Sequence, residues 1–339
     1  MINKTLIICL LCIFYFKNIN FAQEKKLSLW SFQSADTLDK KRVKSMTILG
    51  VGSYVGVFTL LSQAWYSKYD RTKFHLFNDN QEWQQMDKVG HVFGGYFESR
   101  WFSQAYQWAG VSQRRSAYIG AAAGTIIQGT LEISDGYSKK WGFSVGDIAA
   151  NTTGTLLFLG QELAWKEQRL MMKVSNTPKK YSNEVIFSQD KLYAMPLSTR
   201  AHNLLGDNYI VSFLKDYNAQ TLWLSGNIRS FFPESRVPKW LNVAVGYGAE
   251  NLYVGDNKYA WTQEKTANGI PAGTIFPFDA AKYPRYRQFY LSLDIDLTKI
   301  KTKSHFWNTV LHGINVIKIP APALEFNSLG KVQFHPIYF

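Results

Sequence analysis

The residues best suited to chemistry lie in the segment DKVGHVFGGYFES, which begins at Asp87. Asp87, His91 and Glu98 follow one another at spacings of four and seven residues, so a helix would place all three on one face. Asp87 could then orient the His91 ring by accepting its proton. Gly94 and Gly95 weaken the same helix, which predicts that another helix approaches it closely here.

Two further segments carry polar pairs with the same four-residue spacing in otherwise apolar sequence. Gln128 and Glu132 close one predicted helix, and Asp147 and Asn151 open another. Burial of such groups is unfavourable unless they meet one another. We therefore expect the helices to bring together one polar cluster, made of Asp87, His91, Glu132, Asp147 and Asn151.

Three interpretations of this cluster stay open. Asp87 and His91 can be a structural hydrogen-bonded pair that locks helix packing. Alternatively, Asp87, His91, Glu132 and Asp147 can bind a hard or borderline divalent ion through one nitrogen and several oxygens. The third interpretation is general acid-base catalysis by His91 with Glu132 or Asp147, which would hydrolyse a lipid or a glycan. The sequence itself identifies neither a metal nor a cofactor.

Candidate ligand-binding residues flank these four: Lys88, Glu98, Arg100 and Asn151. Lys88 and Arg100 can pair either with headgroup phosphates or with the acids of the cluster. Asp147 and Asn151 can also simply cap and pin their helix, as Asp and Asn often do near a helix N-terminus.

Two family resemblances centre on the same residues. The run FNDNQEWQQMDKVGH and the pattern E-S-x-W-x6-W-x-G from Glu98 to Gly110 resemble an uncharacterised bacterial family described as predicted periplasmic lipoproteins, domain of unknown function 2279, over Tyr66 to about Trp165. D-K-x-x-H, Glu132 and GFSVGDIAANTTG also look like the VanZ-like membrane family. The resemblance implies an envelope location and a helical hairpin bundle, and it brings no established activity.

The N-terminus predicts export. Residues 1–22 combine a short basic start, the apolar run Leu6 to Phe16 and a small-residue cleavage site, as in a cleavable signal peptide. Both cysteines, Cys9 and Cys12, lie inside it, and neither follows a convincing lipoprotein cleavage box. We therefore expect a periplasmic or outer-membrane-associated protein without thiol chemistry.

The charge and the aromatic content of the chain indicate the class of its partner. The chain has 38 Lys and Arg against 25 Asp and Glu, a net charge of +13. In an exported protein this favours anionic lipid headgroups or cell-wall polymers over nucleic acid, or it simply keeps the chain soluble. Its 11 Trp, 19 Tyr and 23 Phe are typical of a wet-dry boundary. A membrane lipid or another envelope component is thus the expected partner, and the oligomeric state is not indicated.

An α+β fold is predicted, with a helical bundle domain at 40–173 that carries the DKxGH motif and a β-rich region at 174–339. About four small-residue-rich helices are expected, at 45–65, 83–108, 116–132 and 143–171, the last with Ser144 as N-cap. Residues 45–65 carry no charge, so a membrane-spanning helix and a buried helix are both possible there.

The β-rich region shows about four clear strand patterns. They lie at 220–232, 240–250, 288–297 and 331–339, with a helix at 305–316. This is fewer than the roughly eight strands of the smallest outer-membrane barrel, so a complete barrel is not expected. Asn218, Trp223, Trp240 and Tyr247 are the residues expected to contact lipid or another envelope component.

Two functions are therefore carried forward. The first is a noncatalytic envelope protein with a structural or interaction role at a membrane. The second is a membrane-proximal hydrolase or transferase that acts on lipid or cell-wall material through Asp87, His91, Glu132 and Asp147.

Overall fold

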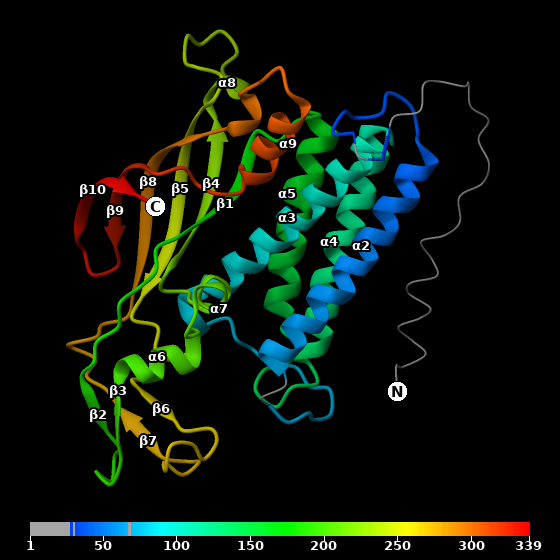
Figure 1. Cartoon of the computed structure of the whole chain (residues 1–339). Coiled ribbons are helices and arrows are strands. Elements are labelled where there is room, and N and C mark those ends of the chain that lie inside the picture. Colours follow the sequence, from blue (N-terminus) through cyan, green and yellow to red (C-terminus); the bar gives the residue numbers. More distant parts are fainter. Residues whose placement is uncertain (1–27, 30, 67–68) are drawn as a thin grey trace.

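The computed structural model describes residues 28–29, 31–66 and 69–339 (Figure 1). Long helices come first along the chain and strands follow, so a helical region lies beside a sheet. The predicted α+β class is confirmed in this form, whereas embedding of the helices in a membrane stays a prediction. The predicted signal peptide and both cysteines lie outside the described residues.

Four long helices form the helical region: α2 Lys40–Leu61, α3 Met86–Trp108, α4 Gln113–Asp135 and α5 Val145–Ala164. The last three pack against one another, and glycine makes this possible. A Cβ at Gly95 would collide with the backbone oxygen of Asn151, and one at Gly154 would collide with that of Val92. The close approach expected at Gly95 is therefore present between α3 and α5.

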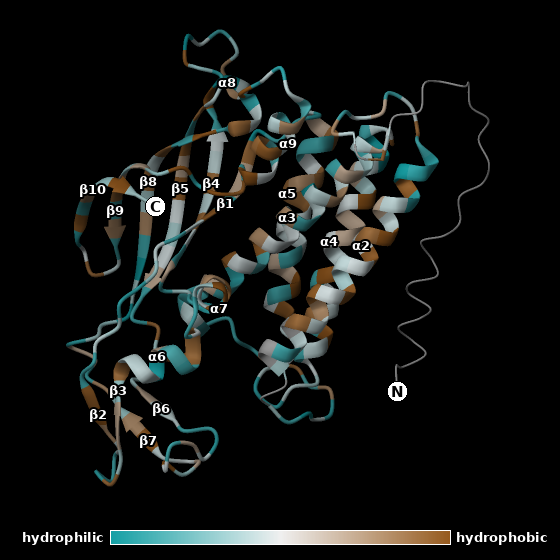
Figure 2. Cartoon of the chain, in the orientation of Figure 1, coloured by the Kyte–Doolittle hydropathy of each residue, from teal (hydrophilic) through white to brown (hydrophobic). Residues whose placement is uncertain are grey.

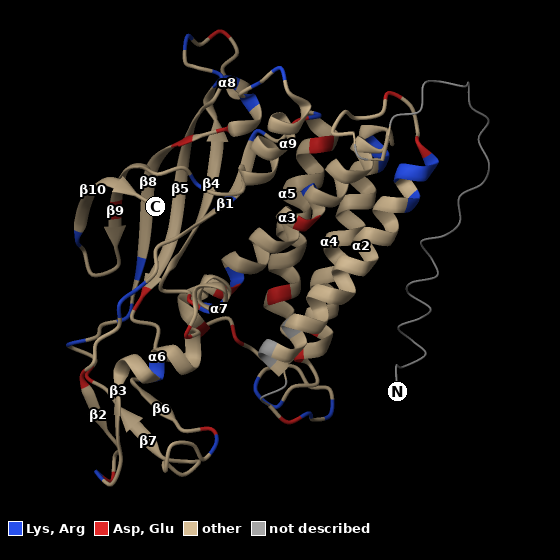
Figure 3. Ribbon diagram, in the orientation of Figure 1, with Lys and Arg blue, Asp and Glu red and all other residues tan. Residues whose placement is uncertain are grey.

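Helix α2 lies on the outside of this group. Its stretch Lys40–Leu60 is long and apolar enough to cross a membrane by length and composition, and its most apolar part is not buried. The alternative of a buried core helix is therefore wrong. Figure 3 shows that the charged residues of α2 lie at its N-terminal end, where the buried Arg42 guanidinium lies 4.1 Å from the Trp108 ring centre. The hydroxyls of Thr47 and Tyr106 lie 2.8 Å apart and join α2 to α3.

Several helix ends differ from the predicted ranges, among them ends of α2, α3 and α5. α2 begins five residues early, at Lys40, because the Asp39 side chain caps it by accepting from the backbone N–H groups of Lys41 and Arg42. α3 begins late, at Met86, because Trp83 to Gln85 have φ values of 50 to 62° within the short turn η2 Glu82–Gln85. α5 ends at Ala164, and the residues expected to continue it from Leu170 form a strand instead.

The main sheet is antiparallel and has six strands in the order β1-β4-β5-β8-β9-β10. Their bounds are β1 Leu170–Asn176, β4 Gln220–Asn227, β5 Leu241–Glu250, β8 Tyr286–Ile295, β9 Ala321–Asn327 and β10 Val332–Tyr338. The strand expected at 220–232 ends at Asn227 because its side chain accepts from the Ser230 N–H and caps a short helix, α8 Ile228–Phe231. The expected domain boundary at 173 falls inside β1.

Smaller elements complete the fold. Two hairpins, β2 Val185–Phe187 with β3 Ala194–Pro196 and β6 Ala260–Thr262 with β7 Ile275–Pro277, surround a second apolar core with helix α6 Leu197–Leu205. The remaining segments are η1 Ser62–Tyr66, α7 Tyr209–Lys215, η3 Leu297–Lys299 and α9 His305–Ile314. The helix expected at 305–316 is thus present in slightly shorter form.

The main sheet has an unusual distribution of polarity. Along β8, Ser292 and Asp294 are buried, whereas Leu291 and Leu293 are each 48% exposed. Along β5, Ala244 is 1% exposed and Val245 is 52% exposed. Hydrophobic residues accordingly occur on both the helices and the strands (Figure 2). The apolar face of the sheet packs against α3 at Leu222 and Leu224, and along β5 and β8 the same face, which we call the outward face, stays partly exposed.

This arrangement corrects two expected contact residues. Asn218 and Trp223 are buried, so neither can contact lipid directly. Trp223 lies on the inward face, where its indole N–H donates to the Ser175 hydroxyl at 2.9 Å. Trp240 is exposed, and Tyr247 lies half-buried on the apolar face.

Candidate functional site

The structure brings the predicted polar cluster together. α3 presents Asp87 and His91, α4 presents Glu132 near its end, and α5 presents Asp147 and Asn151 in its first turns. The helices meet here because α3 and α5 approach each other closely at their glycines. Four-residue spacing keeps each pair on one helix face, so the convergence follows from the pattern in the sequence.

His91 lies at the centre of the cluster. Its Nδ1 lies 3.0 Å from the amide oxygen of Asn151, which can only accept a hydrogen bond. Its Nε2 faces three carboxylate oxygens, at 3.7 Å from Asp87 Oδ1, 3.6 Å from Glu132 Oε1 and 3.6 Å from Asp147 Oδ1. These three separations exceed the usual hydrogen-bond length. One ring nitrogen is therefore fixed by Asn151, and the other lies at the meeting point of the acids.

Lys88 supplies the positive charge next to these acids. Its Nζ lies 2.6 Å from Asp147 Oδ1, 2.6 Å from Asp79 Oδ1 and 3.3 Å from Asp87 Oδ2. Burial alone would lower the pKa of Lys88, but the three carboxylates outweigh it and raise that pKa. Of the two partners expected for this lysine, the structure shows the acids.

Glu132, Asp147 and His91 bind protons more tightly than usual. Burial raises the pKa of Glu132 to about 8, and burial together with the charge of Asp87 raises that of Asp147 to about 7. Burial lowers the pKa of His91, but the charges of Asp87, Asp147 and Glu132 outweigh it and raise that pKa to about 9. Near neutral pH these three groups therefore hold protons that the same groups would largely have released in water.

Three contacts were missed from the sequence. Asp79 accepts from the Ser144 hydroxyl at 2.6 Å, while the same hydroxyl accepts from the Asp147 N–H at 3.1 Å, which confirms Ser144 as N-cap. The Ser144 N–H lies 3.4 Å from Glu132 Oε2. The Tyr217 hydroxyl donates to Asp87 Oδ1 at 2.9 Å. Asp79 stands in the FNDNQEW run and could have been noticed, but Tyr217 follows α7 in the distant second half of the chain and carried no signal.

Two candidate ligand residues lie apart from the cluster. Glu98 accepts from the Gln128 side-chain amide at 2.9 Å, and burial raises its pKa to about 8. Arg100 is buried further along α3, beside a cavity of about 170 Å³ that Glu162 and His312 also line. No contact between Arg100 and the cluster is present among the described residues.

The arrangement has the parts of both an acid-base site and a cation site. One ligand atom each from Asp87, His91 and Asp147 can be chosen so that all three lie within 4.8 Å of one another. The side chains of Asp87 and His91 are 23% and 18% exposed, so the cluster is reached from solvent on one side. The roles predicted for these residues stay predictions.

Comparison with known proteins identifies the segment that builds the site. Residues 75–159 match a family model described as predicted periplasmic lipoprotein (DUF2279). No curated protein and no solved structure is significantly similar to the chain. The match confirms the first resemblance seen in the sequence, while similarity to the VanZ-like family is not shown. The matched segment includes Asp79 and all the cluster residues on α3, α4 and α5, but it ends before Tyr217. The chain is therefore an exported, periplasmic or outer-membrane-associated protein whose site-bearing segment matches the predicted periplasmic lipoprotein family DUF2279.

Proposed function

We propose that the chain is a noncatalytic envelope protein that associates with lipid through the outward face of its main sheet. The observation that carries this proposal is the reversed polarity of β5 and β8. In a sheet with one solvated face, apolar residues normally point to the core and polar residues to water. Here the arrangement is the opposite on these strands, which is favourable when the outer face meets hydrocarbon.

The outward apolar side chains form one continuous surface. Val245 pairs with Leu291, and Val243 pairs with Leu293, so these four are cross-strand neighbours on β5 and β8. Phe289 pairs with Phe326 and extends the surface onto β9. Each of these six side chains is at least one-third exposed. Soluble proteins rarely expose an apolar surface that spans several strands without a partner.

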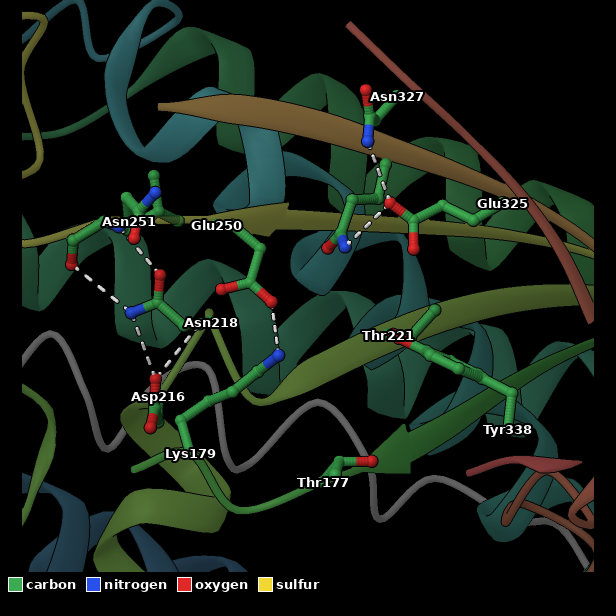
Figure 4. A network of polar contacts seen from close by, with 12 residues as sticks. Thr177, Lys179, Asp216, Asn218, Thr221, Glu250, Asn251, Glu325, Asn327 and Tyr338 are labelled. Atoms are coloured by element: carbon green, nitrogen blue, oxygen red, sulfur yellow. Dashed lines mark hydrogen bonds and ion pairs between the residues drawn. The ribbon is translucent and has the colours of Figure 1, made fainter. Parts of the chain in front are cut away.

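The inward face of the sheet carries polar side chains that are paired with one another, so this face has to stay buried. Lys173 Nζ and Asp294 Oδ2 lie 2.7 Å apart with both side chains fully buried, and the Ser225 hydroxyl donates to the same Asp294 oxygen at 2.6 Å. Figure 4 shows further polar contacts, including those of Tyr338 with Thr221 and of Asn327 with Glu325. Internal satisfaction of polar groups is what a protein in contact with hydrocarbon requires.

Two other features of the molecule are also apolar. A cavity of about 370 Å³ separates the sheet from α3, with walls that include Val89, Leu224, Val245 and Phe289. The exposed helix α2 adds a second apolar element, with basic residues at its N-terminal end that suit anionic headgroups. Hydrocarbon chains fit both features, so lipid is the occupant that we propose for the outward face.

The test is flotation of the purified chain with vesicles of phosphatidylethanolamine and phosphatidylglycerol. We expect the wild type to float, and to remain bound in high salt, where attraction between surface charges is screened. Leu291→Gln with Leu293→Gln should weaken partitioning at least about a hundredfold, because each leucine in hydrocarbon contributes about 1.5–3 kcal/mol. Leu192→Gln, which changes a leucine that is 75% exposed in another hairpin, is the matched control and should float like the wild type.

Two results would contradict the proposal. Release of the wild type by salt would show that charge alone holds it at the vesicle. A chain that does not float but sediments as a dimer, which the double leucine variant dissociates, would make the outward face an interface between two copies instead.

A second function is favoured by the convergence of Asp87, His91, Glu132 and Asp147. An imidazole within 3.7 Å of three carboxylates, open to solvent on one side, has the groups of a hydrolase or transferase acting on lipid or cell-wall material. The test is incubation of wild type and His91→Gln with phospholipid and with peptidoglycan fragments. Product from the wild type alone would support an enzyme, whereas no product from either protein would remove this candidate.

A further inference from the structure

We infer that the polar cluster binds one borderline divalent metal ion, such as Zn²⁺ or Mn²⁺, through His91, Asp87 and Asp147, with Glu132 as the fourth ligand. One imidazole nitrogen and several carboxylate oxygens suit such an ion, and no thiolate is present among the described residues to select a softer one. This inference is independent of the association with lipid.

The spacing around His91 Nε2 is the first argument. Its distances of 3.6 to 3.7 Å to the three carboxylate oxygens are too long for hydrogen bonds but close to ligand spacing around a metal. Tetrahedral bonds of about 2.1 Å place neighbouring ligand atoms roughly 3.4 Å apart. Ligand atoms of Asp87, His91 and Asp147 lie within 4.8 Å of one another, so side-chain movement inward would bring these three onto one ion, and Glu132, whose Oε1 is 3.6 Å from Nε2, would follow as the fourth ligand.

The orientation of the imidazole is the second argument. Because the Asn151 amide oxygen accepts at 3.0 Å, Nδ1 carries a proton whether the ring is charged or neutral, and a metal ion would displace only the second proton, on Nε2. In the neutral ring the lone pair of Nε2 then points toward Asp87, Glu132 and Asp147. Metal-binding histidines are commonly oriented in this way, by donating the other ring N–H to an oxygen outside the metal shell.

Glu132 supplies an independent observation. Its side chain is 1% exposed, and Oε1 has no hydrogen-bond donor although it lies 3.6 Å from His91 Nε2. A buried carboxylate oxygen without a donor is unfavourable. A cation between His91 and the acids would satisfy this oxygen, which the surrounding protein leaves unpaired.

A second histidine-carboxylate pair shows the contrast. His335 Nε2 lies 2.9 Å from Glu325 Oε2, which is an ordinary hydrogen-bond length, and no second acid forms an ion pair with His335 in the part of the chain that the structure describes. His335 is therefore a structural partner of one acid, whereas His91 faces three acids at a longer distance. It provides the matched control for the metal site.

Lys88 provides a further test of the metal site, because its charge lies next to one of the proposed ligands. Its ammonium already shares Asp147 Oδ1 with the proposed site and competes with a metal for that oxygen. Removal of this charge with Lys88→Gln should therefore tighten metal binding, because two nearby positive charges repel each other. A purely structural ion-pair network would show no saturable metal binding in either protein.

The experiment is titration of the full, chelator-treated chain with Zn²⁺ and with Mn²⁺ by isothermal calorimetry, with folding checked by circular dichroism. We expect one ion per chain, at least about tenfold weaker binding in His91→Gln, and unchanged binding in His335→Gln. Asn151→Ala, which keeps every ligand, should weaken binding about 10- to 100-fold.

Other outcomes overturn the inference. Absence of saturable binding by the wild type, or equal affinity of wild type and His91→Gln, would leave the cluster as an ion-pair network. Should His91→Gln not fold, X-ray absorption of the zinc-loaded wild type decides. Mixed nitrogen and oxygen ligands with one imidazole support the site, and any other ligand set contradicts it.

Discussion

Both regions of the molecule bury polar side chains, but they differ in how these are satisfied. In the sheet, Lys173 and Asp294 meet at 2.7 Å, and the Asn242 side-chain amide donates to the Ser225 hydroxyl at 2.9 Å. Among the helices, buried atoms of Glu98, Glu132 and five other side chains lack any hydrogen-bond partner, whereas in the described strands of the main sheet Asn176 Nδ2 alone does. Buried polar groups with hydrogen-bond partners support the fold, whereas buried polar groups without them indicate where a ligand or a proton is missing. We therefore assign stability to the sheet interior and chemistry to the helices.

The largest effect is expected from breaking the buried pair in the sheet. Asp294→Ala leaves the Lys173 ammonium buried without its carboxylate, which should lower the free energy of unfolding by about 3–5 kcal/mol. Urea denaturation followed by tryptophan fluorescence measures this. In the double variant Lys173→Met with Asp294→Leu, both charges are gone, so most of the loss should be recovered. A loss below about 1 kcal/mol for the single variant would show that the sheet interior does not depend on this pair.

A smaller effect should come from separating α3 and α5. Gly154→Ala places a methyl group against the Val92 carbonyl oxygen, and we expect a loss of about 1–3 kcal/mol in unfolding free energy. Gly160→Ala on the same helix is the matched control, because a Cβ there has no atom within 4 Å. That substitution should stabilise the helix by up to about 1 kcal/mol. Equal effects of the two substitutions would disprove close packing as the cause of the convergence.

The smallest effect concerns the pH dependence of stability. Burial raises the pKa of Glu98 to about 8, above its ordinary value of 4.5, so the folded chain holds a proton that the unfolded chain releases. The stability contributed by this proton is complete below the ordinary pKa and is lost as the pH rises through about 8. Glu98→Gln should match the wild type at low pH and be more stable than it at high pH.

Thermal unfolding over a series of pH values measures this difference. Glu234→Gln changes an exposed glutamate and should give a curve parallel to that of the wild type at every pH. If Glu98→Gln also ran parallel to the wild type, Glu98 would be ionised in the folded chain, and the contrast between the two interiors would weaken.

The sequence predicted the site better than it predicted the sheet. Spacing of four residues placed Asp87, His91, Asp147 and Asn151 on helix faces, and these faces meet in the structure. Tyr217 could not be found in this way, because its contact with Asp87 depends on the path of the chain through the second half of the molecule. Local periodicity contains no information about such a path.

The sequence showed the alternating pattern of β8, but it did not show which face of the strand is buried. The alternation in QFYLSLDIDL separates two faces of β8, and an alternating pattern alone does not say which face is buried. Trp223 was expected at the surface because it is aromatic, yet it lies inside beside Ser175. Leu170 and Met171 were included at the end of the helix predicted at 143–171, but pairing with β4 makes them part of a strand.

The position of β1 has a consequence for the order of folding. The Val174 N–H donates to the Val316 carbonyl, and the Lys318 N–H donates to the Val174 carbonyl, while β4 occupies the other edge of the same strand. Chain that emerges N-terminus first can pack its helices early, because their contacts are local. One edge of β1 cannot form its hydrogen bonds until Val316 and Lys318, near the end of the chain, are available. Such late, long-range pairing slows folding and leaves a strand edge open to aggregation in the meantime.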